Sequence, residues 1–273
     1  MRTSVIHTLL FAILLAGCTN KEKEARSMLD KARNMYERDE LISAKNEIDS
    51  IRAWYPKEFG VLKETLELMR LVELKEAERA IAFCDSFIPV KQAESVELSK
   101  GFIFEKDSVY EEIGNYIWKQ QTIERNVERS YIRCGVNEKG EMYLTSVYFG
   151  SAPINHTGIK ASTKEGTYTE TASIPYDGGL NYRFKDAGNI SEIVNYKGEH
   201  CADVAHFIYT NNKERIKIDY TGGKPYTIYL SDTEKKAIVA TYDLTTVLSD
   251  IERIKTEKEK ALKKQTYLKG KLK

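Results

Sequence analysis

The chain has 273 residues, and its 42 Lys and Arg residues against 41 Asp and Glu residues give a formal net charge of +1. A balance this close gives no electrostatic reason to expect a nucleic-acid partner. The length suffices for one large domain or two modest ones.

The first segment of the chain has the organisation of a signal peptide. Arg2 gives a short cationic start, and residues 9–16 form an uninterrupted apolar run. That run is far shorter than the roughly 20 residues that a membrane-spanning helix needs. It has the proportions of the apolar region of a secretory leader, so residues 1–17 are excluded from the predicted fold.

The residues that end this leader, Leu15-Ala16-Gly17-Cys18, resemble the lipobox of bacterial lipoproteins. The resemblance implies cleavage before Cys18 and acylation of its thiol, so that residues 18–24 become a lipidated tether. Acyl chains stabilise membrane attachment by about 0.8 kcal/mol per buried methylene. Since Thr19 and Asn20 follow the cysteine, the resemblance to Gram-negative lipoproteins implies the outer membrane, on either its periplasmic or its surface face. The alternative is an ordinary secretory peptide with a chance cysteine.

Residues 25–100 are predicted to form a helical stalk domain. Two apolar faces at spacings of three and four residues, within 25–36 and 41–51, indicate two consecutive amphipathic helices. The pair resembles one tetratricopeptide-type hairpin, in which the small residues Ala32 and Ala44 let antiparallel helices approach closely. The early aromatic residue of that repeat is missing and the pattern does not recur, so the resemblance does not imply a stacked superhelix.

A longer helix is predicted over residues 56–87, ended by Pro89 because proline lacks a backbone N–H. Its expected apolar seam recurs about every 3.5 residues and comprises Phe59, Leu62, Leu66, Met69, Ala80, Cys84 and Phe87.

Residues 101–231 are predicted to form an antiparallel β domain. Turn residues at 137–140, 177–179, 186–189, 211–212 and 222–223 separate runs rich in Tyr, Ile, Val, Phe and Thr. One of these turns is expected to join a strand over 203–209 to a strand over 215–220. The second strand alternates apolar and polar residues, so one of its faces is buried and the other is wet. Closure as a curled sheet, a sandwich or an open barrel is left open.

A second long helix is predicted over residues 232–273, with Ser231 and Asp232 as its N-cap. Its last eleven residues carry five lysines and no acid, which indicates a solvated helix end or, alternatively, a contact with anionic lipid headgroups. The predicted fold class is α+β: a helical hairpin with a long helix, an antiparallel β-meander, and a long C-terminal helix that packs back on the N-terminal helices.

Three cysteines remain once Cys18 is assigned to the lipid, and an odd number cannot all pair within one chain. Cys84 lies in a helical pattern and is expected to be a small buried apolar residue. Cys134 and Cys201 lie in the β domain and are either free or joined by a disulfide in an oxidising envelope.

The tyrosines of the β domain are the first candidates for a ligand site. Eleven of the 17 tyrosines lie between residues 131 and 229, where most are expected to pack across strands. The alternative is an aromatic platform for a sugar or a peptide. Tyr176, Asp177 and Tyr182 flank a glycine-rich turn and are the candidate ligand-binding residues.

No metal, cofactor or catalytic group is expected from the sequence. His200, Cys201, Asp203 and His206 lie close together, but a zinc site usually needs a second pair of ligands elsewhere. His206 is expected on a buried strand face. The chain has no GxSxG, HExxH or phosphate-binding glycine loop. A dyad of Cys134 with His156 or His206 would need the fold to bring the two side chains together.

The sequence therefore favours a lipid-anchored, non-enzymatic envelope protein that binds or scaffolds a partner at the outer membrane. The alternative is a glycan-binding, lectin-like accessory lipoprotein, and the third hypothesis is an envelope hydrolase. The expected partners are the membrane, through the lipid on Cys18, and an envelope protein or a glycan. The oligomeric state is open.

Overall fold

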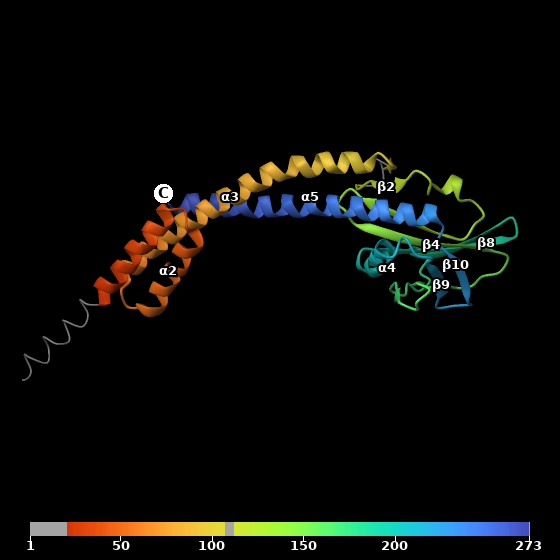
Figure 1. Ribbon diagram of the computed structural model, residues 1–273, viewed down its shortest axis with the longest axis horizontal. Helices are drawn as coiled ribbons and strands as arrows, with labels where there is room; N and C mark the ends of the chain where they lie inside the picture. Colours follow the sequence, from red (N-terminus) through yellow and green to blue (C-terminus); the bar gives the residue numbers. More distant parts are fainter. Residues whose placement is uncertain (1–20, 107–111, 273) are drawn as a thin grey trace, which may run out of the picture. The chain divides into compact units, whose positions relative to one another are not determined.

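A computed structural model describes residues 21–106 and 112–272, and it confirms the predicted α+β class (Figure 1). The chain divides into two compact units. The helical unit comprises residues 21–86 and 255–272, and the β unit comprises residues 87–254, apart from 107–111. Cys18 lies outside the described residues. Among the helices that are described, none combines the length and the apolar character needed to cross a membrane.

The helical unit contains both helices of the predicted hairpin. The first runs over residues 21–37, and the second, α2, covers Leu41–Trp54. Ala32 and Ala44 are fully buried, as their predicted role at a close helix contact requires. The beginning of a third helix, α3 (Phe59–Ser99), packs on the pair through Val61, Leu68, Met69 and Val72.

One prediction about α3 is wrong and another is only partly right. Pro89 does not end the helix, which continues to Ser99. An interior proline costs about 3 kcal/mol, but packing offsets this cost because Leu98 contacts a buried cluster that includes Leu244 and Val247. The expected seam is only partly right: Met69 and Cys84 are buried, but Phe59 is 78% exposed, whereas Val61 and Thr65 are fully buried. Apolar residues lie on both sides of this helix, so their spacing alone does not identify the buried side.

The final helix, α5 (Asp232–Lys271), packs antiparallel on α3, as predicted (Figure 1). In the helical unit, Lys258 pairs with Asp85 at 2.5 Å and Lys264 pairs with Glu73 at 3.4 Å. Lys264 is one of the five lysines in the last eleven residues, so part of that group pairs with an acid of α3.

The predicted N-cap of α5 is present and forms a capping box. The Ser231 hydroxyl accepts the Glu234 backbone N–H at 3.2 Å, and the Glu234 carboxylate accepts the Ser231 backbone N–H at 2.9 Å. The same carboxylate accepts the backbone N–H of Ile132 at 3.2 Å, which fixes the start of α5 to the neighbouring sheet.

The β unit contains two antiparallel sheets, and within the described residues neither closes into a barrel. Sheet A has six strands, in the spatial order β1 (Phe102–Glu105), β2 (Asn115–Trp118), β3 (Tyr131–Asn137), β4 (Met142–Gly150), β8 (Asn189–Lys197) and β7 (Asn181–Asp186). Sheet B has four, in the order β10 (Tyr226–Tyr229), β9 (Lys217–Thr221), β5 (Gly158–Ser162) and β6 (Tyr168–Glu170).

The predicted hairpins at 137–140, 186–189 and 222–223 are confirmed. Ala187 and Gly188 both have positive φ, at 47° and 89°, as expected for the two central residues of a tight hairpin turn.

The predicted strand over 203–209 is wrong, because these residues belong to helix α4 (Glu199–Thr210). Its buried residues follow helical spacing: Cys201, Val204, Ala205 and Ile208. The composition of residues 207–209, Phe-Ile-Tyr, is nevertheless typical of a strand. His206 is consequently exposed on a helix rather than buried on a strand, and its Nδ1 lies 3.0 Å from the Tyr242 hydroxyl.

One buried cluster joins sheet A, sheet B, α4 and the start of α5. Ile132 and Leu144 enter it from sheet A, Ile159 and Ile218 from sheet B, and Ile238 from α5. Because successive strand residues point to opposite faces, the intervening residues of both sheets face away from this core. The two outer faces therefore carry the strand side chains that a ligand can reach.

Candidate functional site

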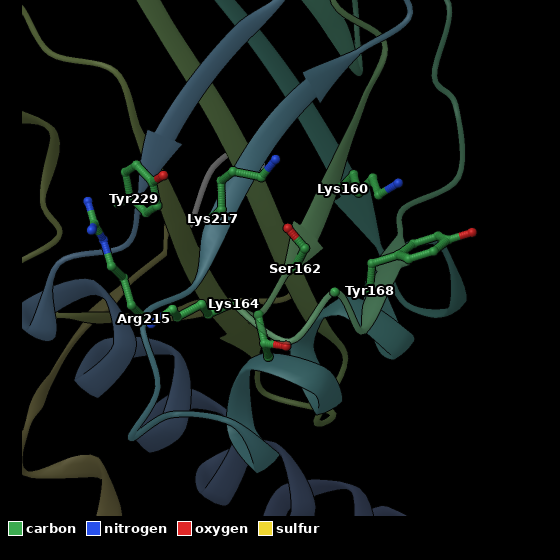
Figure 2. Close-up of a pocket in the computed structure, with 9 residues that line it drawn as sticks. Lys160, Ser162, Lys164, Tyr168, Arg215, Lys217 and Tyr229 are labelled. Carbon is green, nitrogen blue, oxygen red and sulfur yellow. The ribbon is translucent and has the colours of Figure 1, made fainter.

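A basic and aromatic pocket lies on the outer face of sheet B (Figure 2). Its volume is about 600 Å³. Figure 2 shows Tyr229 beside Arg215 on one side, Tyr168 beside Lys160 on the other, and Lys217 with Ser162 between them. We call it the basic pocket; its lining residues are Lys160, Ser162, Thr163, Lys164, Gly166, Tyr168, Arg215, Lys217 and Tyr229.

Strand alternation explains how this pocket forms. Ile159 and Ala161 of β5 are buried in the core, so Lys160 and Ser162 face outward. On β9, Ile218 is buried and Lys217 faces outward; the register pairs Lys217 with Ser162 on one side and with Tyr229 on the other. The polar residues of three neighbouring strands are thereby gathered on one surface.

The two tyrosine rings are held by cations. The Lys160 ammonium lies 3.7 Å from the centre of the Tyr168 ring, and the Arg215 guanidinium lies 3.8 Å from that of Tyr229. Contacts of this kind contribute about 0.5–1 kcal/mol at exposed sites. They orient both rings while leaving them substantially accessible, at 59% for Tyr168 and 49% for Tyr229.

The positive charge of the pocket is only partly balanced. Lys217 pairs with Asp219 at 2.8 Å, and this contact raises the pKa of the lysine, which therefore stays charged. Lys160 approaches Glu170 at 3.7 Å. Among the described residues, no carboxylate lies within 4.0 Å of Lys164 or Arg215. These two cations are available to an anionic ligand.

A pair of acids lies next to these two cations in the sequence. Desolvation and a hydrogen bond with Glu165 raise the pKa of Glu214. A hydrogen bond from its own backbone, followed by the contact with Glu214, lowers the pKa of Glu165. The two carboxyl groups therefore lie close enough to affect each other's ionisation, beside Lys164 and Arg215.

The sequence-predicted candidates Tyr176, Asp177 and Tyr182 do not line the basic pocket. Asp177 accepts the backbone N–H groups of Gly179 at 2.8 Å and Asn181 at 2.9 Å, so its carboxylate stabilises the turn. Tyr176 lies beneath the Arg183 guanidinium, 5.0 Å from the ring centre. Arg183 and Tyr182 alternate along β7, and Tyr182 lines a different cavity, on the outer face of sheet A. The fold therefore does not bring the two tyrosines together on one platform.

A buried chain of hydrogen bonds lies on the core side of the sheets. The Ser146 hydroxyl lies 2.8 Å from His156 Nε2, and His156 Nδ1 lies 2.9 Å from Glu192 Oε2. The Tyr196 hydroxyl also lies 3.0 Å from that of Ser146. This is the connectivity of a Ser–His–acid triad. All four side chains are at most 2% exposed, so a substrate has no access to Ser146 in this conformation.

The electrostatics of this chain follow from its burial. Desolvation lowers the pKa of His156 despite its contact with Glu192, so the ring is neutral at neutral pH. Burial alone would raise the pKa of Glu192, but hydrogen bonds from the backbone of Asn155 and from His156 outweigh it, and the pKa is lowered. The carboxylate also accepts the Ile154 N–H at 2.9 Å, which makes three consecutive backbone donors. Glu192 thereby fixes the segment that enters β5.

The cysteines and histidines do not form the dyads considered from the sequence. Cys134 Sγ lies 3.2 Å from Gln121 Oε1 and 3.3 Å from Thr241 Oγ1, whereas His156 and His206 have the partners given above. Cys84, Cys134 and Cys201 are free and buried. Within residues 21–106 and 112–272, no three His, Cys, Asp or Glu side chains are grouped as metal ligands.

Sequence reasoning missed most of the basic pocket. The alternation of residues 215–220 did indicate a wet face carrying Arg215 and Lys217. Nothing in the sequence placed Lys160, Lys164 and Tyr168 beside that face, because the pairing of β5 with β9 crosses more than fifty residues.

Comparisons with known proteins add no relative to these observations: no family model, curated protein or solved structure matches the chain.

Proposed function

We propose that the chain is a lipid-anchored protein of the bacterial cell envelope whose β unit binds an acidic glycan in the basic pocket. The observation that carries the proposal is the pocket itself, in which two accessible tyrosine rings flank four cations. Lys164 and Arg215 have no acidic partner within 4.0 Å among the described residues. Aromatic rings offer flat apolar surfaces to sugar rings, and the cations suit the carboxylates of a uronic acid or an acidic substituent.

Binding is tested with a matched pair of ligands. A tetramer of galacturonic acid is titrated into the protein by calorimetry, and its fully methyl-esterified form serves as the uncharged control. The acid is expected to bind at least tenfold more tightly than the ester and to weaken as salt is raised, because the contacts lie at the surface. Equal affinity for the two forms would overturn the electrostatic part of the proposal.

Variants of the protein locate the site. The double variant Lys164→Gln/Arg215→Gln removes the two unpaired cations and is expected to weaken binding of the acid at least tenfold. The control Lys139→Gln/Lys185→Gln removes the same charge from exposed positions outside the pocket and is expected to bind like the wild type. If both double variants lose affinity equally, the effect reflects net charge rather than a site.

The proposed anchor is tested separately. Cells that express the wild type or Cys18→Ala are labelled with an alkyne analogue of palmitate, and the protein is then isolated. Label on the wild type alone is the expected result, because the thiol of Cys18 is the proposed acylation site. Equal labelling of both would contradict the anchor while leaving the glycan site unaffected. A protein crosslinked to the β unit, with no glycan bound, would instead favour a scaffolding role.

A further inference from the structure

A second cavity, of about 330 Å³, lies on the outer face of sheet A. Its floor is formed by side chains of β3, β4, β8 and β7, and its rim includes the segment around the 3-10 turn η1 (Ile123–Arg125). The size lies at the lower end of the range for small-molecule sites.

The floor is apolar over two consecutive rows of the sheet. The register places Tyr131 opposite Val147, Val147 opposite Ile193, and Ile193 opposite Tyr182. The next row carries Phe149, Ser191 and Phe184. Ile123 and Val127, which are 61% and 64% exposed, line the cavity from the loop. Apolar surface left open in this way favours the apolar part of a ligand.

The row on the other side of Tyr131 and Val147 is polar. It places Arg133 opposite Thr145, and Thr145 opposite Asn195. The Thr145 hydroxyl donates to Asn195 Oδ1 at 2.7 Å, and the Asn195 amide donates to the Leu180 carbonyl at 3.3 Å. Thr145 and Asn195 are therefore already hydrogen-bonded to protein groups.

Arg133 is the exception in this row. Its Nε is buried and has no hydrogen-bond partner, and no acid pairs with its guanidinium among the described residues. A buried donor without an acceptor costs about 1–3 kcal/mol. The nearby Arg129 is different, because it pairs with Glu234 at 3.3 Å. Two acids also line the cavity: Asp186, from the tip of the β7–β8 hairpin beyond both apolar rows, and Glu128, from the loop at the rim.

We propose that this cavity binds a medium-chain fatty acid, with its carboxylate on Arg133 and its chain along the two apolar rows. A guanidinium matches a carboxylate through two parallel hydrogen bonds, and the two Nη groups of Arg133 can supply both. A saturated acid of eight to ten carbons has an apolar chain that can lie along these rows. The site lies on a different sheet from the basic pocket and does not depend on it.

Octanoate is the probe, and octanamide is its uncharged counterpart with the same chain. Both are titrated into the full protein by calorimetry, and octanoate labelled with ¹³C at the carboxyl carbon is followed by NMR. Octanoate is expected to bind at least tenfold more tightly than octanamide, with a shift of its carboxyl resonance. If millimolar octanoate does not bind, or if the two compounds bind equally, the proposal is overturned.

Two arginine variants locate the carboxylate. Arg133→Gln is expected to weaken octanoate binding at least tenfold and to leave octanamide binding unchanged. Arg183→Gln is the matched control, because Arg183 lies on β7 of the same sheet but contacts Asn155 and Tyr176 rather than the cavity. Equal loss in both variants contradicts the assignment. Phe184→Ser removes half-exposed apolar surface and should weaken both compounds alike. If Arg133→Gln does not fold, the comparison of octanoate with octanamide on the wild type still decides the outcome.

Discussion

Replacing Glu192 by glutamine tests whether the buried hydrogen-bond chain holds the two sheets together. Glu192 Oε1 accepts the N–H groups of Ile154 and Asn155, and Oε2 accepts the backbone N–H and Nδ1 of His156. Glutamine keeps the shape of the side chain and one of its two oxygens. The second oxygen becomes an NH₂ group, a donor that would face two N–H donors. Hydrogen bonds to a charged group contribute about 1.5–3 kcal/mol each, and the ring can rearrange its tautomer, so we expect a loss of about 3 kcal/mol.

The measurement uses a fluorescent residue in the β unit. Trp54 and Trp118 are the two tryptophans, and Trp54 lies in α2 at 67% exposure. In a Trp54→Phe background, the fluorescence of Trp118 on β2 reports on the β unit alone. If the free energy of unfolding falls by about 2 kcal/mol per molar of urea, the midpoint of the urea unfolding curve should fall by about 1.5 M in Glu192→Gln.

A matched control separates the buried chain from a general effect of charge. Glu124→Gln removes an exposed carboxylate from the same unit and should change the free energy of unfolding by no more than about 0.5 kcal/mol. If the urea midpoint of Glu192→Gln is as close to that of the wild type as the midpoint of Glu124→Gln, the buried hydrogen-bond chain does not stabilise the β unit.

Three further predictions concern the same unit. The pKa of His156 lies below its ordinary value of 6.5 and that of Glu192 below 4.5, so the unfolded state binds more protons as the pH falls through these values. Their stabilisation is complete above about pH 6.5 and is lost on acidification; a urea midpoint that rises between pH 7 and pH 4 would contradict this. Gly140 has a φ of 80°, and a Cβ there would lie 2.3 Å from the backbone nitrogen of Ser249. Gly140→Ala should therefore lower the free energy of unfolding by more than Gly166→Ala, where φ is 90° and the space is open. Equal urea midpoints of the two variants would rule out the close contact. Burial raises the pKa of Cys134 to about 12 and that of Cys201 to about 11. A maleimide at pH 8 should therefore label both thiols only after unfolding, as read by mass spectrometry. Rapid labelling of the native protein would contradict this prediction.

Local signals in the sequence predicted much of the fold. Hairpin turns at 137–140 and 186–189, the N-cap at Ser231 and the small residues of the helical hairpin each act within a few residues of their position. The errors arise where tertiary contacts override a local preference. Pro89 is tolerated because the helix beyond it packs against other residues of the β unit. The α4 segment is helical because Val204 and Ile208 are buried on one face, although Phe207 and Tyr209 favour a strand.

The candidate sites were less predictable than the fold. Each is a set of residues gathered by strand pairing over long distances, and no local pattern specifies which strands will pair. Arg133, Thr145 and Asn195 lie in one row only because β4 pairs with both β3 and β8. Tyr176 and Tyr182 flank one glycine-rich turn, but alternation along β7 directs Tyr182 toward the outer face of sheet A and its neighbour Arg183 toward Tyr176.

The buried Ser146–His156–Glu192 chain bears on how enzymes are recognised from structure. The Ser146–His156 distance of 2.8 Å and the His156–Glu192 distance of 2.9 Å both lie within the hydrogen-bond range of a catalytic triad. The same hydrogen bonds also join the segment that enters β5 to sheet A, because His156 between a carboxylate and a hydroxyl has partners for both of its ring nitrogens. The geometry of the neighbours alone therefore does not identify a nucleophile, because solvent access to its hydroxyl is a separate requirement.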